Sequence, residues 1–170
     1  MSTMQADAVT PAGPVRWDKA GWVVVALNLV MAFMSTMYFL AQARVGVAGW
    51  LAMNSCAPSI FLFVLGYLCR SLPVMAVGAG LMFRYGTLGL FFFGWDGPNL
   101  IAQVGHIFMT VAVCYVLTLI VRRRARHELA VAVLVAVAML YANWQNEWFN
   151  RHPQALAALF QGQVSAADVR

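Results

Sequence analysis

Arg84 is the residue of this 170-residue sequence whose type and position most clearly suggest chemistry, because it lies inside a long apolar segment. A charged side chain at the centre of a membrane span costs at least about 2.5–3.5 kcal/mol, so it needs a partner. Glu147, Asp96, a helix C-terminus or a bound anion could provide one. Arg84 is therefore predicted to form a structural ion pair or to anchor a ligand or ion.

Polar residues in the other apolar segments recur at spacings of three and four, which places them on one face of a helix. The clearest series is Asn99, Gln103, His106, Thr110, Cys114 and Thr118. Estimated depths in the membrane suggest that the polar faces converge on a pocket that opens outward, with Arg84 at its floor. The predicted ligand-binding residues are Arg84, His106, Gln103, Asn54, Asn143, Asn146 and Glu147. In the alternative interpretation these side chains only hydrogen-bond neighbouring helices, each contact contributing about 0.6–2 kcal/mol.

Other kinds of site receive little support. The sequence has no glycine-rich phosphate loop, HExxH, CxxC or nucleophile elbow. His106 and Glu147 form the one credible acid–base pair, without a nucleophile between them, which favours a non-enzymatic role. No cofactor is predicted. The weaker alternatives are haem on His106 and Met109, and copper(I) on sulfur ligands. The sulfur ligands considered are Met31, Met34, Met37, Met53 and Cys56.

The composition determines which elements position these residues. Apolar residues make up 62% of the chain and charged residues 10%, and the mean hydropathy is +0.74. A soluble domain is nearer half apolar and a quarter charged. A soluble enzyme, a disordered chain and a disulfide-stapled secreted module are excluded. The predicted fold class is an all-α integral membrane protein with five transmembrane helices.

The apolar segments define the predicted domain organisation. Spans of about 20 apolar residues are predicted at 21–41, 47–69, 72–95, 99–121 and 129–148. A flexible cytoplasmic tail (1–19) precedes the membrane domain (20–150), and the tail at 151–170 has the spacing of a short interfacial helix. Two alternatives stay open: 72–95 could be a re-entrant hairpin, and the first helix could be a signal peptide cleaved after Ala43.

Positive charge predicts the orientation. One side of the membrane collects Arg16, Lys19, Arg70, Arg122, Arg123, Arg124 and Arg126, and the other only Arg44, Arg151 and Arg170. The protein is therefore predicted to lie in the cytoplasmic (inner) membrane, with its N-terminus on the inside and its C-terminus on the outside. The arginine cluster is expected to touch anionic lipid head groups rather than nucleic acid. Between the third and fourth spans, Gly97 is expected to provide an unusual backbone angle in a compact turn.

These features favour a multi-pass membrane protein that binds or permeates a small polar or anionic solute. The first alternative is an accessory or anchoring subunit of a membrane complex, in which the polar faces serve helix packing. The second is a membrane-embedded redox or lipid-modifying enzyme. The expected partners are the lipid bilayer, the solute, and either further copies of the chain or a larger membrane complex.

Overall fold

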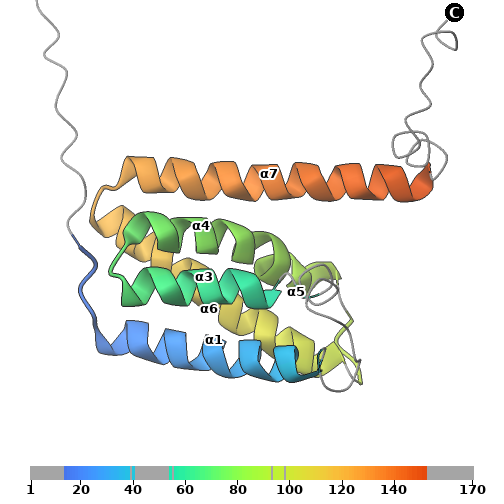
Figure 1. Cartoon of the computed structure of the whole chain (residues 1–170), viewed down its shortest axis with the longest axis horizontal. Helices are drawn as coiled ribbons and strands as arrows, with labels where there is room; N and C mark the ends of the chain where they lie inside the picture. Colours follow the sequence, from blue (N-terminus) through green and yellow to red (C-terminus); the bar gives the residue numbers. More distant parts are fainter. Residues whose placement is uncertain are drawn as a thin grey trace, which may run out of the picture. The chain divides into compact units, whose positions relative to one another are not determined.

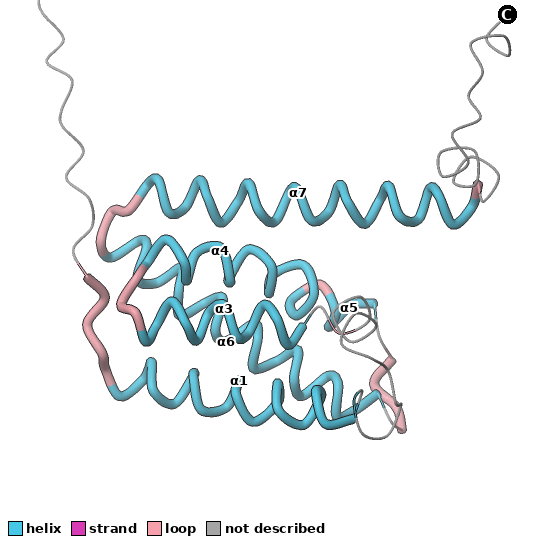
Figure 2. The backbone as a smooth tube through the Cα atoms, viewed as in Figure 1, coloured by secondary structure: helices cyan, strands magenta, loops and turns pink. Residues whose placement is uncertain are grey.

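The computed structural model describes residues 14–38, 40, 54, 56–92, 94–97 and 99–152. All regular structure in these residues is helical, and none of them lies in a strand (Figure 2). The chain forms two compact units, 1–136 and 137–170. Helix α7 (Arg126–Arg151) begins in the first unit and ends in the second.

Within the described residues, four helical runs are long and apolar enough to cross a membrane. They are α1 (Lys19–Met37), the run Leu72–Phe92, α6 (Asn99–Arg122), and the part of α7 up to Trp148. They coincide with the predicted spans 21–41, 72–95, 99–121 and 129–148. The prediction of an all-helical chain with several membrane-length apolar helices is therefore confirmed, while the orientation in the membrane stays a prediction.

The second predicted span, 47–69, is described only in its later part. Helix α3 (Cys56–Leu68) has 13 residues, which corresponds to about 20 Å at 1.5 Å per residue. That length is less than the hydrocarbon thickness of about 30 Å. Residues 47–53 and Ser55 lie outside the described part of the chain, so this span stays a prediction.

The third run combines three helical pieces. Helix α4 (Leu72–Met82) continues into the π-helical turn η2 (Phe83–Thr87), which is followed by α5 (Gly89–Phe92). In η2 the backbone N–H of Leu88 donates to the carbonyl of Phe83 at 3.1 Å, a five-residue step in place of the usual four. The run continues through Arg84 as a helix of membrane length, which favours a span at 72–95. The choice between a span and a re-entrant hairpin stays a prediction.

Glycines allow the helices of the first unit to pack closely. Helix α3 lies against α1 and α4, and α6 lies against α1, α4 and η2 (Figure 1). A Cβ on Gly66 would lie 2.6 Å from the backbone nitrogen of Met75, and one on Gly78 would lie 2.8 Å from that of Phe63. One on Gly80 would lie 2.6 Å from the carbonyl oxygen of Ala132 in α7. Small residues thus let the backbones approach, as is common between membrane helices.

The segment before α1, residues 14–18, also packs against the first unit, and we call it the N-terminal strap. Val15 is fully buried, and its N–H donates to the carbonyl of Arg70 at 2.9 Å. The Trp17 indole donates to the carbonyl of Tyr67 at 3.1 Å. Of the tail predicted at 1–19, residues 1–13 lie outside the described part, and residues 14–18 form contacts that the sequence did not predict.

The turn between α5 and α6 contains the predicted unusual backbone angle. Gly97 has a φ of +43°, in the left-handed region that favours glycine. The N–H of Asn99 donates to the carbonyl of Asp96 at 3.0 Å, which closes the turn before α6.

Candidate functional site

Arg84 lies on η2, about midway along the first unit. Gly86 faces Met109, and Gly89 faces the ring of His106. The hydroxyl groups of Thr87 and Thr110 are hydrogen-bonded at 3.2 Å. These contacts make η2 and α6 antiparallel and put Arg84 level with Val111, which is halfway along the 24-residue α6.

The Arg84 side chain lies among aromatic rings without a carboxylate. Its guanidinium carbon lies 5.8 Å from the ring centroid of Tyr85 and 6.0 Å from that of Phe92. Its Nε is buried and has no hydrogen-bond partner in the described residues. Asp96, one predicted partner, instead accepts from the side-chain amide of Asn99 at 3.1 Å. Among the described residues of the first unit, Arg84 forms no ion pair. A structural ion pair with Glu147 stays a prediction.

Asn54 provides a second buried donor near this level. It is 4% exposed, and its side-chain oxygen accepts from the N–H of Ala57 at 3.3 Å, which caps the start of α3. Its Nδ2 is buried without a partner in the part of the chain that the structure describes. The contacts of Gly66 with Met75 and of Gly78 with Phe63 set the register between α3 and α4. They place Asn54 level with Thr87, about one helical turn from Arg84.

Gln103 and His106 are buried on α6, 0% and 6% exposed respectively. His106 Nδ1 lies 3.1 Å from Gln103 Oε1. The Gln103 amide also donates to the carbonyl of Gly94 at 3.4 Å. The Thr110 hydroxyl donates to the carbonyl of His106 at 2.8 Å. These bonds hold one wall of the site and account for much of the polar face predicted on α6. The ends of that face, Asn99, Cys114 and Thr118, are exposed.

Asn28 of α1 also belongs to this level, although the sequence analysis left it out of the site. Its Nδ2 donates to the carbonyl of Val24 at 2.9 Å and to that of Phe108 in α6 at 3.1 Å. Its Oδ1 is buried without a partner among the described residues. The signal in the sequence is a lone asparagine in an apolar span, four residues before Ala32 on the same helical face.

These residues form one layer across the first unit. We define the polar layer as Asn28, Asn54, Arg84, Thr87, Gln103, His106 and Thr110. In the described chain, four buried side-chain atoms lack a hydrogen-bond partner: Asn28 Oδ1, Thr36 Oγ1, Asn54 Nδ2 and Arg84 Nε. Three of the four belong to the polar layer. Each such group costs about 1–3 kcal/mol when left unpaired, so the layer has unused capacity to bind polar atoms.

Three predicted site residues lie in the second unit. Asn143, Asn146 and Glu147 are exposed on α7. Glu147, the other carboxylate considered as a partner for Arg84, pairs with Arg151 at 3.0 Å. The structure does not test whether these three residues take part in the site, and their inclusion stays a prediction.

The haem and copper alternatives receive no support from the positions of their ligands. His106 and Met109 pack against Gly89 and Gly86, where Cβ atoms would lie 2.8 Å and 2.5 Å from them. Met34 and Met37 are exposed, while Met31 packs against Gly105. In the described ranges, no three His, Cys, Asp or Glu side chains gather as metal ligands would. Met53 lies outside those ranges.

In comparisons with protein-family models, curated proteins and solved structures, nothing matches this chain. The functional argument therefore rests on its own residues.

Proposed function

We propose that this is a multi-pass protein of the cytoplasmic membrane that binds a small anionic solute at Arg84. The observation that carries the proposal is the buried Nε of Arg84, which has no partner among the described residues and lies midway along a membrane-length helix. A charge at that depth is costly, while Asp96 hydrogen-bonds Asn99 and Glu147 pairs with Arg151. A bound anion would supply the missing charge.

Each member of the polar layer has a role in this proposal. Arg84 provides the positive charge and a planar set of donors suited to a carboxylate or an oxyanion. The Nδ2 of Asn54 provides a neutral donor about one turn away. Gln103, His106 and Thr110 hold the wall through their mutual hydrogen bonds.

The position of these groups supports an opening toward the outer side. Asn54, Gln103 and His106 all lie between the level of Arg84 and the turn at 94–97. Beyond Arg84, toward the other end, the unit is filled by buried apolar residues such as Phe63, Met75 and Val116. With the N-terminus inside, as the charge distribution predicts, the polar half faces outward and Arg84 forms its floor.

Anion-dependent thermal unfolding of the full-length protein in mild detergent tests this proposal. The probes are sodium phosphate, sulfate, nitrate, chloride and short-chain carboxylates, compared at constant ionic strength. A ligand that binds only the folded state stabilises it in proportion to RT ln(1 + [L]/Kd). We expect at least one probe to raise the unfolding temperature of the wild type and of Arg84→Lys, but not that of Arg84→Gln.

The matched control is Arg151→Gln, which removes a charge from an exposed residue paired only within α7. It should respond to the anion as the wild type does. Equal stabilisation of all variants would contradict the proposal, as would a wild type that no probe stabilises.

One observation favours the second candidate function, an accessory subunit of a membrane complex. The exposed amides Asn143, Asn146 and Asn150 lie on α7 in the second unit. Polar residues at such positions often hydrogen-bond across to a partner helix. If this role is correct, the double variant Asn143→Ala/Asn146→Ala should lose a co-purifying chain in native mass spectrometry, while Arg84→Gln should keep it.

A further inference from the structure

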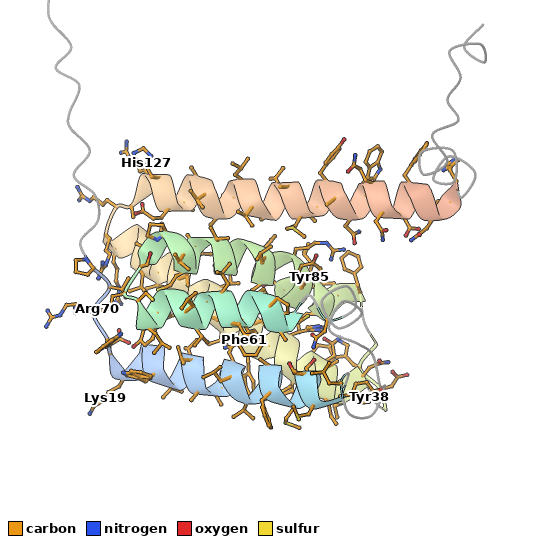
Figure 3. The ribbon with its side chains drawn as sticks, viewed as in Figure 1. Lys19, Tyr38, Phe61, Arg70, Tyr85 and His127 are labelled. Carbon is orange, nitrogen blue, oxygen red and sulfur yellow. The ribbon has the colours of Figure 1, made fainter. Side chains whose placement is uncertain are left out.

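Positive charges gather at one end of the first unit, opposite the end that carries the turn at 94–97. Asp18, at the start of α1, contacts Tyr67 near the end of α3 and Tyr115 in the second half of α6. The helix ends that carry the charges therefore meet. Lys19, Arg70 and His127 lie at this end, and Tyr38 lies at the other (Figure 3). The cations of this end are Arg16, Lys19, Arg70, Arg122, Arg123, Arg124 and Arg126.

The N-terminal strap brings three of these arginines together. Arg70 Nε donates to the carbonyl of Val15 at 2.8 Å, and Arg123 Nη2 donates to the carbonyl of Pro14 at 3.3 Å. Arg16 follows Val15 directly in the strap and is exposed. Arg70 and Arg123, at the ends of α3 and α6, thus bond the two strap residues that precede Arg16.

The carboxylates at this end do not neutralise the cluster. Asp18 Oδ1 already accepts from the N–H of Gly21 at 2.6 Å and from the Tyr115 hydroxyl at 3.1 Å. Glu128 is the other carboxylate among the described residues here. Seven cations against two carboxylates leave this end strongly positive.

Two of the arginines also adopt a backbone conformation that is unusual for their residue type. Arg70 has a φ of 56° and Arg124 a φ of 52°. Each follows a helix whose end is closed by a six-to-one bond, from Ser71 to Gly66 in α3 and from Ala125 to Ile120 in α6, both between backbone atoms. Glycine is the usual residue at this position. Arginine occupies this position after both α3 and α6, at the same end of the unit, although glycine would avoid the backbone strain.

We propose that Arg16, Arg70 and Arg123 bind the phosphate of an anionic phospholipid at this end of the first unit. The inference goes beyond the solute site at Arg84 and does not depend on it. Arginine recognises phosphate through paired donors, and each basic residue near an anionic membrane surface contributes about 1 kcal/mol of attraction.

The surroundings of the cluster favour a lipid over a free anion. Trp17 and Trp22 are 53% and 45% exposed, and their rings lie 6.1 Å apart. Such rings are typical of the membrane–water interface. On the helices that end here, Val23 of α1 and Leu65 and Leu68 of α3 are exposed apolar residues. An acyl chain could lie along them while its head group meets the arginines.

Native mass spectrometry of the full-length protein in mild detergent tests the lipid site. The probes are phosphatidylglycerol and phosphatidylcholine with identical acyl chains, supplied in equal amounts. We expect the wild type to retain phosphatidylglycerol preferentially. Arg16→Gln should retain about fivefold less, the factor that corresponds to about 1 kcal/mol. Arg16→Lys keeps the charge and should stay close to the wild type.

Arg16 is the primary variant because it is exposed and forms no described contact that supports the fold. Arg151→Gln serves as the matched control and should bind like the wild type. Equal retention of the two lipids by the wild type would overturn the proposal, as would unchanged retention by Arg16→Gln. Displacement of phosphatidylglycerol by excess sodium phosphate at constant ionic strength would show a site for free phosphate and would also overturn it.

Discussion

The two halves of the first unit differ in whether their polar groups are hydrogen-bonded. Near the start of α1, the Asp18 carboxylate is satisfied by Gly21 and Tyr115, and the Tyr67 hydroxyl donates to the carbonyl of Asp18 at 3.1 Å. From the level of Arg84 to the turn at 94–97, several buried polar atoms have no partner. All four unpaired atoms of the described chain lie here, since the register of α1 against α6 puts Thr36 level with Leu100.

This difference separates a structural role from a binding role. A buried polar group that is fully paired stabilises a particular packing, whereas one left unpaired costs free energy unless another molecule binds it. The half around Asp18 therefore fixes the helix ends. The polar layer leaves donors and acceptors unpaired, as the proposed binding role requires, and four substitutions test the contrast.

Removing the charge of Arg84 should have the largest effect. A hydrogen bond to a charged group contributes about 1.5–3 kcal/mol, so Arg84→Gln should weaken anion binding by at least about tenfold. Its unfolding temperature without anion should equal or exceed that of the wild type, because an unpaired buried charge is lost. Titration calorimetry and thermal unfolding measure the two quantities. If Arg84→Gln had a lower unfolding temperature than the wild type and still bound the anion, Arg84 would have a structural role instead of a binding role.

Removing the Asp18 carboxylate should have the opposite effect: it should lower stability and leave anion affinity nearly unchanged. Asp18→Ala loses the cap on α1 and the bond from Tyr115, so we expect a loss of stability of about 2 kcal/mol. Anion affinity should stay within about twofold, because the polar layer lies some 15 Å away along α1 by its rise per residue. Chemical denaturation and anion titration check the two parts. Unchanged stability would show that this half is not held together as described.

Asn54→Ser should separate the cap of α3 from the donor of the polar layer. Serine also caps helices well, so the fold should keep its stability, while the lost Nδ2 should weaken anion binding by about fivefold, or about 1 kcal/mol. The measurement is the dissociation constant of the anion that stabilises the wild type. If this variant bound the anion as tightly as the wild type, Asn54 would not take part in binding.

Arg124→Gly should have the smallest effect of the four substitutions, and it should stabilise the protein. Glycine relieves the strained backbone angle at the end of α6, so we expect a gain of about 0.5–1 kcal/mol in unfolding free energy. Anion binding at the polar layer should not change. The matched substitution Arg70→Gly also loses the bond to Val15 and should gain less. A loss of stability in Arg124→Gly would show that its side chain supports the fold.

The fold was largely predictable because apolar length and helical spacing report directly on membrane helices. The spans that contain Arg84 and His106 lie where the sequence placed them, and Gln103 and His106 share a buried face. The π-helical turn at 83–87 was not predictable, because a five-residue step depends on how Gly86 and Gly89 pack against α6.

The site was predictable only in part. Arg84 and Asn54 were selected as candidates because charged and amide groups stand out in apolar segments. Spacing alone could not show that Glu147 pairs with Arg151 within its own helix. It also did not place Asn28 among the ligand-binding residues, because the level of Asn28 follows from its tertiary contact with Phe108. The packing of the N-terminal strap depends on Val15 and Trp17, two apolar residues within a polar stretch.

The central claim, that the Arg84 guanidinium binds an anion, can be observed directly by nuclear magnetic resonance. The full-length protein would be labelled with ¹⁵N-arginine, and the Nε signal of Arg84 assigned by its absence in Arg84→Lys. The probe is the anion that stabilises the wild type in thermal unfolding. We predict a saturable shift of the Arg84 signal at concentrations where the exposed arginines do not move. A stationary Arg84 signal while the anion binds, or shifts shared equally by all arginines, would contradict the account.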